Sequence, residues 1–233
     1  MKIVLFGASG MIGQSVLREA LLDGEVSEIL AVGRSPLGRD DKKIRELVHQ
    51  DFTDFTSVAG ALTGYDACLF CLGTSSAGMS EADYRRVTYD FALAAARTLA
   101  ERNPGMTFVF VSGAGTDSTE QGRSMWARVK GATENALLEL PFKAAYMFRP
   151  GYIQPMHGIK SRTKLYRVLY AVVGFGFPLW RRLFPKYMTT TEQVGRAMLH
   201  VAKHGADKPV LENWDIDQIG QIGQVGRPAT PSA

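Results

Sequence analysis

The sequence predicts an α/β fold built on a doubly wound, mainly parallel sheet with a small C-terminal subdomain. Short apolar runs alternate along the chain with longer amphipathic segments, the order expected of strands and crossover helices. Three of these runs, IVLF, CLFCL and FVFV, are continuously apolar, as are strands that helices cover on both faces. The chain has 233 residues, enough for one large domain. We therefore expect a single domain over residues 1–220, followed by a flexible Gly- and Pro-rich tail over 221–233.

The same alternation assigns the individual elements. The expected strands are Lys2–Phe6, Glu28–Val32, Arg45–His49, Ala67–Cys71, Thr107–Val111 and Ala144–Arg149. The expected helices are Ile12–Leu22, Ser57–Leu62, Glu81–Arg102, Arg123–Leu140 and Thr191–Lys203. Because helices separate most of the strands, the strands run parallel and the helices cover both faces of the sheet. Residues 151–190 follow the last expected strand and form the small subdomain on the ligand-binding side.

Composition and charge exclude several classes of protein. About 45% of the residues are hydrophobic and the net charge is +4, with no block of five or more Lys or Arg. We therefore expect no nucleic-acid partner and no polybasic membrane patch. The longest apolar run, Val168–Trp180, is too short to cross a bilayer. Its thirteen residues indicate a buried helix and loop, with membrane-surface contact or a lid over a hydrophobic substrate left open. Lacking a signal-peptide pattern, the chain is expected in the cytoplasm.

The chain has two cysteines, Cys68 and Cys71, at Cys-x-x-Cys spacing. This spacing raises redox and zinc-binding interpretations. The pair lies inside the apolar run ACLFCLG, and no second Cys or His cluster supplies further zinc ligands. We therefore expect two buried, reduced thiols and no metal site.

Three glycines follow the first expected strand at a regular spacing, Gly7-x-x-Gly10-x-x-Gly13. Such glycines allow a tight turn, close approach of the backbone to a pyrophosphate, and close packing of helix on strand. The N-terminus of the following helix then offers free N–H groups to the anion. The spacing therefore predicts a dinucleotide site rather than a merely glycine-rich turn. The expected phosphate-binding residues are Gly7, Ala8, Ser9, Gly10, Met11, Ile12 and Gly13.

The end of the second expected strand predicts which dinucleotide binds. A ribose-binding carboxylate is expected there for NAD, roughly twenty positions after the glycines. The sequence instead has Gly33, Arg34 and Ser35. A planar guanidinium with five donors suits a 2′-phosphate. We therefore expect NADP(H) to be preferred over NAD(H), with a solvent-facing Arg34 in a turn as the alternative.

Two further strand ends complete the expected cofactor site. Asp51 and Phe52 follow the third strand, where a carboxylate can accept a hydrogen bond from an adenine amino group. The alternative for Asp51 is an ordinary turn or cap residue. The residues Cys71, Leu72, Gly73 and Thr74 follow the fourth strand, and Gly73 lets the backbone approach the cofactor.

Six motifs occur in an order that resembles one protein family. They are Gly7-x-x-Gly10-x-x-Gly13, Val32-Gly-Arg34, Asp51-Phe52, Cys71-Leu-Gly-Thr74, Val111-Ser112-Gly and Arg149-Pro-Gly-Tyr152. Together they resemble the atypical (extended-like) short-chain dehydrogenase/reductase family, whose members have an NAD(P)-binding Rossmann fold. The similarity is greatest to the branch of Tat-interacting oxidoreductase-like, NmrA-like and small epimerase-like proteins. It covers nearly the whole chain.

The resemblance implies a Ser, a Tyr and a Lys that act together. In that family the Lys holds the nicotinamide ribose and lowers the Tyr pKa, and the Tyr exchanges a proton with the substrate. Ser112 and Lys130 match the family Ser and Lys. Trp126 stands four residues before Lys130, where the family has Tyr, and an indole has no usable acid–base pKa. A strand-end cap for Ser112 and a solvated helical Lys130 remain the alternatives.

Other residues could supply the missing acid–base group. Tyr152, with Pro150 and Gly151, is expected near the nicotinamide, and Tyr84 precedes a helix that runs beside the cofactor in this fold. His157 is expected in a loop that shapes the substrate site. The segment 151–190 is rich in aromatic residues, which suggests an apolar ligand or a protein partner, with core packing as the alternative. These residues are Tyr152, Tyr166, Tyr170, Phe175, Phe177, Trp180, Phe184 and Tyr187.

The sequence therefore predicts an NADP(H)-dependent oxidoreductase on an unidentified small carbonyl or alcohol. A non-catalytic NADP(H)-sensing protein that binds a partner is the alternative, because Trp126 replaces the usual Tyr. A nucleotide-sugar epimerase ranks last, since the chain is short for the added sugar-binding domain. A homodimer is compatible with the apolar segment over 165–187.

Overall fold

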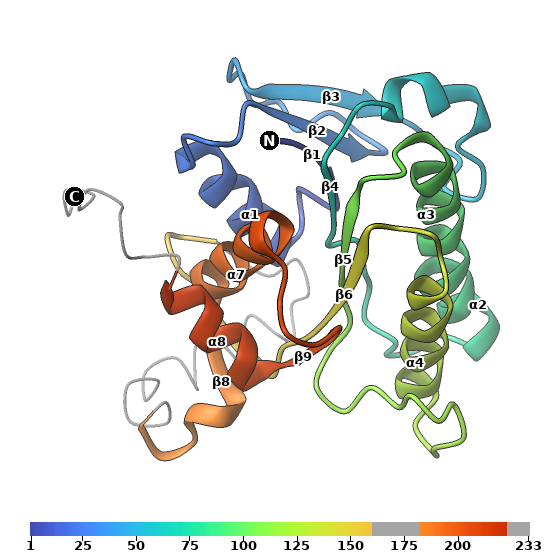
Figure 1. The fold of residues 1–233 in the computed structure, drawn as a ribbon. Helices are drawn as coiled ribbons and strands as arrows, with labels where there is room; N and C mark the ends of the chain where they lie inside the picture. The colour runs from blue at the N-terminus through green and yellow to red at the C-terminus, as the bar shows by residue number, and fades with distance from the viewer. Residues whose placement is uncertain (160–181, 223–233) are drawn as a thin grey trace.

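A computed structural model describes residues 1–159 and 182–222 of the chain (Figure 1). The described residues form one seven-stranded sheet with the order β3-β2-β1-β4-β5-β6-β9, and every neighbouring pair is parallel. Its strands are β1 Lys2–Phe6, β2 Glu28–Gly33, β3 Ile44–Val48, β4 Ala67–Phe70, β5 Thr107–Val111, β6 Ala144–Arg149 and β9 Val210–Glu212. The doubly wound parallel sheet expected from the sequence is therefore confirmed.

Helices cover both faces of the sheet (Figure 1). One layer contains α1 Met11–Leu22, α7 Thr191–His204 and α8 Asn213–Ile222. The other contains α2 Glu81–Arg85, α3 Phe91–Arg102 and α4 Met125–Leu138. A π-helical turn, Arg86–Asp90, joins α2 to α3, and the junction residues keep helical dihedrals, so the helix expected over Glu81–Arg102 continues through this turn. The short helix expected over Ser57–Leu62 is a 3₁₀ helix, Thr56–Leu62.

The continuously apolar strands are explained by two cores, one on each face of the sheet. Successive residues of β1 point to opposite faces: Ile3 and Leu5 pack with α1 and α7, whereas Val4 and Phe6 pack with α3. All four side chains are fully buried. A strand in this position needs an apolar residue at every position, which is the pattern that the sequence shows.

Three short elements were not expected from the sequence. They are β9 and the parallel pair β7 Tyr152–Gln154 and β8 Met188–Thr190. Each strand has three residues, too few for a periodic pattern.

Helix α8 was not expected either, and it includes residues 221 and 222, the first two residues of the expected tail. Its Gly220 allows close helix packing, since a Cβ there would lie 2.5 Å from the Gln193 carbonyl oxygen on α7.

Part of the aromatic segment lies outside the described residues. This applies to the expectations on the run Val168–Trp180 and on Tyr166, Tyr170, Phe175, Phe177 and Trp180. Within the described part, Phe184 is 50% exposed and Tyr187 is 66% exposed, so ordinary core packing does not describe these two side chains. No helix in the described part is both long and apolar enough to cross a bilayer.

Candidate functional site

The turn between β1 and α1 requires its glycines for steric reasons. Gly7 has a φ of 76°, and a Cβ there would lie 2.7 Å from the amide nitrogen of Leu72. A Cβ on Gly13 would lie 2.0 Å from the Gly7 carbonyl oxygen. That oxygen accepts a hydrogen bond from the amide of Gly10 at 2.9 Å. Gly10 is the N-cap of α1 and has no side chain to satisfy the first N–H groups of the helix, which favours an anion there.

A cavity of about 300 Å³ lies at the carboxyl ends of β1, β2 and β4. The β1–α1 turn, the loop after β2, the segment after β4 and Phe52 line it. It brings together ten of the expected cofactor residues, namely Gly7, Ala8, Ser9, Gly10, Arg34, Ser35, Phe52, Cys71, Leu72 and Gly73. The other expected residues do not line it, namely Met11, Ile12, Gly13, Asp51, Thr74, Ser112, Lys130, Pro150, Gly151 and Tyr152.

Asp51 is exposed and serves a local turn. Its Oδ1 accepts hydrogen bonds from the amide of Thr53 at 2.9 Å and from the Thr53 hydroxyl at 2.5 Å. These bonds hold the pKa of the carboxyl below its usual range. These contacts are those of an ordinary turn residue, which was the alternative for Asp51 from the sequence. Phe52 is 3% exposed, and its ring meets that of Phe6 edge to face, so it forms an apolar wall of the cavity.

Glu46 lines the cavity, although the sequence did not lead us to expect it there. It lies on β3, opposite Ala31 of β2, and both residues line the cavity. Its Oε2 accepts a hydrogen bond from the amide of Leu37 at 2.9 Å. Arg34 is exposed, and its carbonyl accepts from Gln50 Nε2 at 2.7 Å. The sequence contained one signal for Glu46, namely a charged residue inside the expected strand that follows the loop with Arg34.

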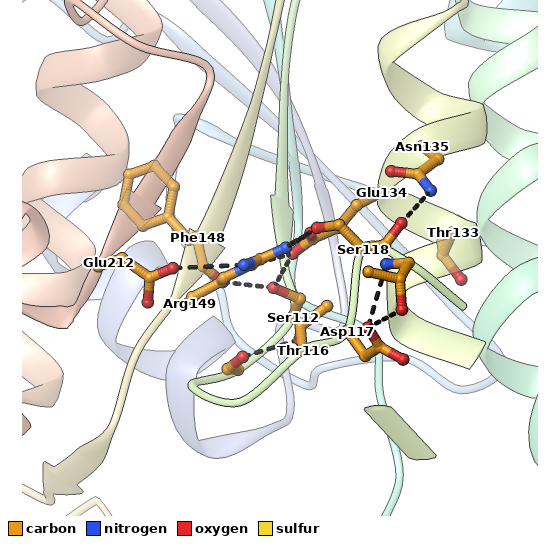
Figure 2. A network of polar contacts seen from close by, with 12 residues as sticks. Ser112, Thr116, Asp117, Ser118, Thr133, Glu134, Asn135, Phe148, Arg149 and Glu212 are labelled. Atoms are coloured by element: carbon orange, nitrogen blue, oxygen red, sulfur yellow. Dashed lines mark hydrogen bonds and ion pairs between the residues drawn. The ribbon is translucent and has the colours of Figure 1, made fainter. Parts of the chain in front are cut away.

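The Ser112 hydroxyl faces into a buried polar network (Figure 2). It hydrogen-bonds to the carboxylate of Glu134 and lies 3.0 Å from the Phe148 carbonyl oxygen. Glu134 is 1% exposed and is paired with Arg149, whose Nε lies 3.1 Å from both carboxylate oxygens. Arg149 also donates to the Ser118 hydroxyl at 2.6 Å. These contacts are compatible with the strand-end cap considered from the sequence, and the catalytic role of Ser112 stays a prediction.

Lys130 reaches the main chain of Ser112. Its Nζ donates to the Ser112 carbonyl oxygen at 2.7 Å. Burial lowers the pKa of Lys130 to about 8, although the nearby Glu134 carboxylate acts in the opposite direction. Trp126 lies one turn earlier on α4, with the edge of its ring 3.5 Å from the position of a Cβ on Gly115. Ser112 and Lys130 are thus neighbours, but the carbonyl of Ser112 rather than its hydroxyl meets the ammonium group.

Tyr152 lies on β7, beside the C-terminal elements. Its hydroxyl donates to Gln154 Oε1 at 2.9 Å, and burial raises its pKa. The amide of Gly151 donates to Asn213 Oδ1 at 2.8 Å, and a Cβ on Gly151 would lie 2.6 Å from the Tyr187 carbonyl oxygen. These contacts fix the chain after β6 against the start of α8.

The two other acid–base candidates lie elsewhere. Tyr84 is 2% exposed, which agrees with a packing residue rather than a group at the surface of a cavity. His157 has a φ of 54° and lies 3.5 Å from the Glu192 carboxylate, as expected of a loop residue.

The two cysteines form no disulfide with each other, and only one of them matches the expected buried thiol. Cys68 is fully buried, whereas Cys71 is partly buried, lines the cavity and contacts the sulfur of Met198 at 3.9 Å. Burial raises the pKa of both groups, so both are thiols at neutral pH. In the described ranges 1–159 and 182–222, no group of three or more His, Cys, Asp or Glu side chains could hold a metal ion.

Comparisons with known proteins agree with this geometry. Residues 7–140 match the family described as NAD(P)H-binding. Protein HTATIP2 of Rattus norvegicus is 30% identical over 154 residues, which are 65% of this chain and 62% of that protein. The mitochondrial protein fmp52-2 of Aspergillus terreus is 23% identical over 216 residues, which are 91% of this chain and 92% of that protein.

Solved structures show the same fold. An oxidoreductase of the short-chain dehydrogenase/reductase family from Burkholderia thailandensis has a TM-score of 0.64 at 17% identity, covering 90% of this chain and 88% of that chain. The UDP-N-acetylglucosamine 4-epimerase of Bacillus cereus has a TM-score of 0.63 at 15% identity, covering 94% and 82%. With the glycine turn, its cavity and the parallel sheet, these findings identify the chain as a member of the NAD(P)H-binding family.

Proposed function

We propose that the protein is an NADP(H)-dependent oxidoreductase that acts on a small carbonyl or alcohol. The observation that supports this most is the cavity in which the glycine turn and the loop bearing Arg34 face one another. Gly7 and Gly13 leave no room for a Cβ, as a turn that carries a pyrophosphate requires. The residues therefore fit a nicotinamide dinucleotide, which supplies or accepts a hydride when bound.

Each part of the cavity has a task in this proposal. The first N–H groups of α1 hold the pyrophosphate, and the guanidinium of Arg34 with the hydroxyl of Ser35 holds the 2′-phosphate. The backbone around Gly73 lies against the cofactor without a side chain in the way. Lys130, anchored on the Ser112 carbonyl, binds the ribose beside the nicotinamide.

The proton of the reaction needs a donor other than the usual phenol. Trp126 has no usable acid–base pKa, and the hydroxyl of Ser112 is engaged with Glu134. Water or Tyr152 remains, and burial raises the pKa of Tyr152, which makes its phenol a weaker acid. The chain therefore offers several groups that would bind the cofactor, but no strong proton donor for the reaction.

A non-catalytic NADP(H)-sensing protein is the second candidate. The inward-facing Ser112 hydroxyl together with Trp126 favours it, because neither group serves proton transfer. A panel of aldehydes and ketones, followed at the nicotinamide absorbance band, separates the two. Turnover by the parent protein, increased by Trp126→Tyr, supports the oxidoreductase. NADPH binding without turnover in both proteins supports the sensor. A nucleotide-sugar epimerase stays third, since its likeness to this chain shows only the fold.

The cofactor preference has a separate test. Arg34→Ala should raise the Kd for NADPH at least about tenfold, because a charge-assisted hydrogen bond contributes about 1.5–3 kcal/mol. The Kd for NADH should change less than about twofold. Fluorescence titration of both cofactors measures this without a substrate. Equal losses for the two cofactors would refute the 2′-phosphate role of Arg34.

The cellular location and the partners stay predictions. The sequence favours the cytoplasm, whereas the names of several relatives contain the word mitochondrial. The proposal of a homodimer or a protein partner is supported by the exposed side chains of Phe184 and Tyr187. Light scattering of the purified protein with and without NADPH would test the homodimer.

A further inference from the structure

We propose that Glu46 is a second determinant of cofactor choice, one that opposes the 2′-phosphate which Arg34 attracts. The proposal rests on the dinucleotide site described above. Glu46 lies on β3, the edge strand of the sheet, two residues before the strand ends. The parallel register sets it opposite Ala31, and both residues line the same cavity as Arg34 and Ser35. The cavity therefore has a carboxylate where a 2′-phosphate site is expected to carry only cations and neutral donors.

The carboxylate of Glu46 also has a structural task. Its Oε2 accepts the amide hydrogen of Leu37 at 2.9 Å. Leu37 itself packs on the core between the sheet and α1, so this bond ties the loop after β2 back onto the sheet. The tied loop is the one that carries Arg34 and Ser35 into the cavity. Loss of the bond should therefore loosen the site for both cofactors alike.

The charge of Glu46 acts differently from its hydrogen bond. Within residues 1–159 and 182–222, Glu46 forms no ion pair, so no partner neutralises it. A 2′-phosphate carries about −1.5 to −2 charges at neutral pH, whereas a ribose 2′-hydroxyl carries none. Repulsion by the carboxylate thus falls on NADP(H) alone and reduces a preference that Arg34 creates. The hydroxyl of NAD(H) can instead donate to a carboxylate oxygen.

Glu46→Gln separates the two tasks, because the amide oxygen still accepts from Leu37 while the charge is gone. Fluorescence titration should show that the Kd for NADPH falls about fivefold, which corresponds to roughly 1 kcal/mol. The Kd for NADH should stay the same or rise. Glu46→Ala loses the bond as well, so it should bind both cofactors more weakly than Glu46→Gln. Asp40→Asn is the matched control, since Asp40 is an exposed carboxylate in the loop between β2 and β3 and does not line the cavity.

The ratio of the two Kd values decides the outcome. A Glu46→Gln ratio equal to that of the parent protein or of Asp40→Asn would overturn the proposal, as would an equal gain for NADPH and NADH. Thermal melting of each variant shows whether the fold is kept. We expect the Glu46 variants to fold, because Glu46 is exposed on an edge strand. Failure of the NADP(H) preference itself has a different signature. The parent protein would then bind NADH as tightly as NADPH, and Arg34→Ala would change neither, whatever Glu46→Gln does.

Discussion

Ser112 directly follows β5, as the sequence predicts, and its hydroxyl bonds to a buried carboxylate that the sequence does not predict. The strand boundary is local information, because five apolar or β-branched residues precede Ser112. The direction of the hydroxyl depends on Glu134 and Arg149, which lie on α4 and β6 (Figure 2). No short-range pattern links three residues that far apart. The position of a motif residue was therefore predictable from the sequence, and its hydrogen-bond partner was not.

This network gives a prediction for Ser112→Ala. The variant should lose about 1 kcal/mol of stability, because a buried hydrogen bond to Glu134 disappears while Arg149 continues to neutralise the carboxylate. NADPH should bind within about twofold of the parent value. Urea unfolding and fluorescence titration measure the two quantities. Ser118→Ala, at the exposed end of the same network, should cost less. A tenfold loss of NADPH affinity in Ser112→Ala would contradict this prediction, because it would mean that the hydroxyl takes part in cofactor binding.

The glycine turn gives a second prediction at this scale. Gly13→Ala should lose NADPH binding and about 3 kcal/mol of stability, since the new Cβ would meet the Gly7 carbonyl oxygen at 2.0 Å. Gly24→Ala is the matched control, because a Cβ there meets nothing within 4 Å. Circular dichroism melts and NADPH titration follow both variants. Unchanged NADPH binding by a folded Gly13→Ala protein would show that the turn does not carry the pyrophosphate.

Elements with a continuous signal were predictable, and those decided by their neighbours were not. β1, β4 and β5 are buried on both faces, so their apolar runs mark them in the sequence. β9 has three residues and is a strand because β6 pairs with it. α8 contains Gly220, which is unfavourable in an isolated helix but allows the close contact with α7. The conformational propensity of a short segment does not depend on residues far away in the sequence, so it could not predict elements that such residues stabilise.

The burial of Lys130 on α4 predicts a pH dependence of stability. Folding lowers its pKa from 10.5 to about 8, so between these values the unfolded chain binds more protons than the folded one. Stability should therefore rise as the pH rises through this window, and the cost of the buried charge is full below about pH 8. Lys130→Met removes the cost. The stability difference between Lys130→Met and the parent should thus be larger at about pH 7 than at about pH 10.

Urea unfolding of the protein without cofactor at both pH values checks this prediction. Other groups that titrate in the same window affect parent and variant alike, so the difference isolates Lys130. A difference that does not change with pH would mean that Lys130 stays charged throughout.

At the scale of the whole molecule, α1 connects the cofactor turn to the C-terminal part of the chain. α1 begins at the glycine turn and packs along α7 (Figure 1). The Ser15 hydroxyl donates to the Thr191 carbonyl at 2.7 Å, and a Cβ on Gly195 would lie 3.1 Å from the Ser15 carbonyl oxygen. Glu19 of α1 is fully buried and pairs with Arg196 of α7. α7 thus holds the helix whose N-terminus faces the cofactor cavity, so damage to this contact should reach the site.

Arg196→Met tests this connection. Arg196 Nε lies 3.2 Å from the Glu19 carboxylate, and the substitution removes this ion pair from a buried charge that also pairs with Arg18. The expected loss is about 3 kcal/mol in urea unfolding, with a weaker affinity for NADPH because α1 is less firmly held. Arg45→Met is the control, because Arg45 pairs with Glu28 at the surface and its side chain is 68% exposed. This substitution should lower the free energy of unfolding by less than about 1 kcal/mol. If both variants lose the same small amount, the buried pair does not hold α1 in place, and the support of the cavity must come from the apolar contacts between α1 and α7 alone.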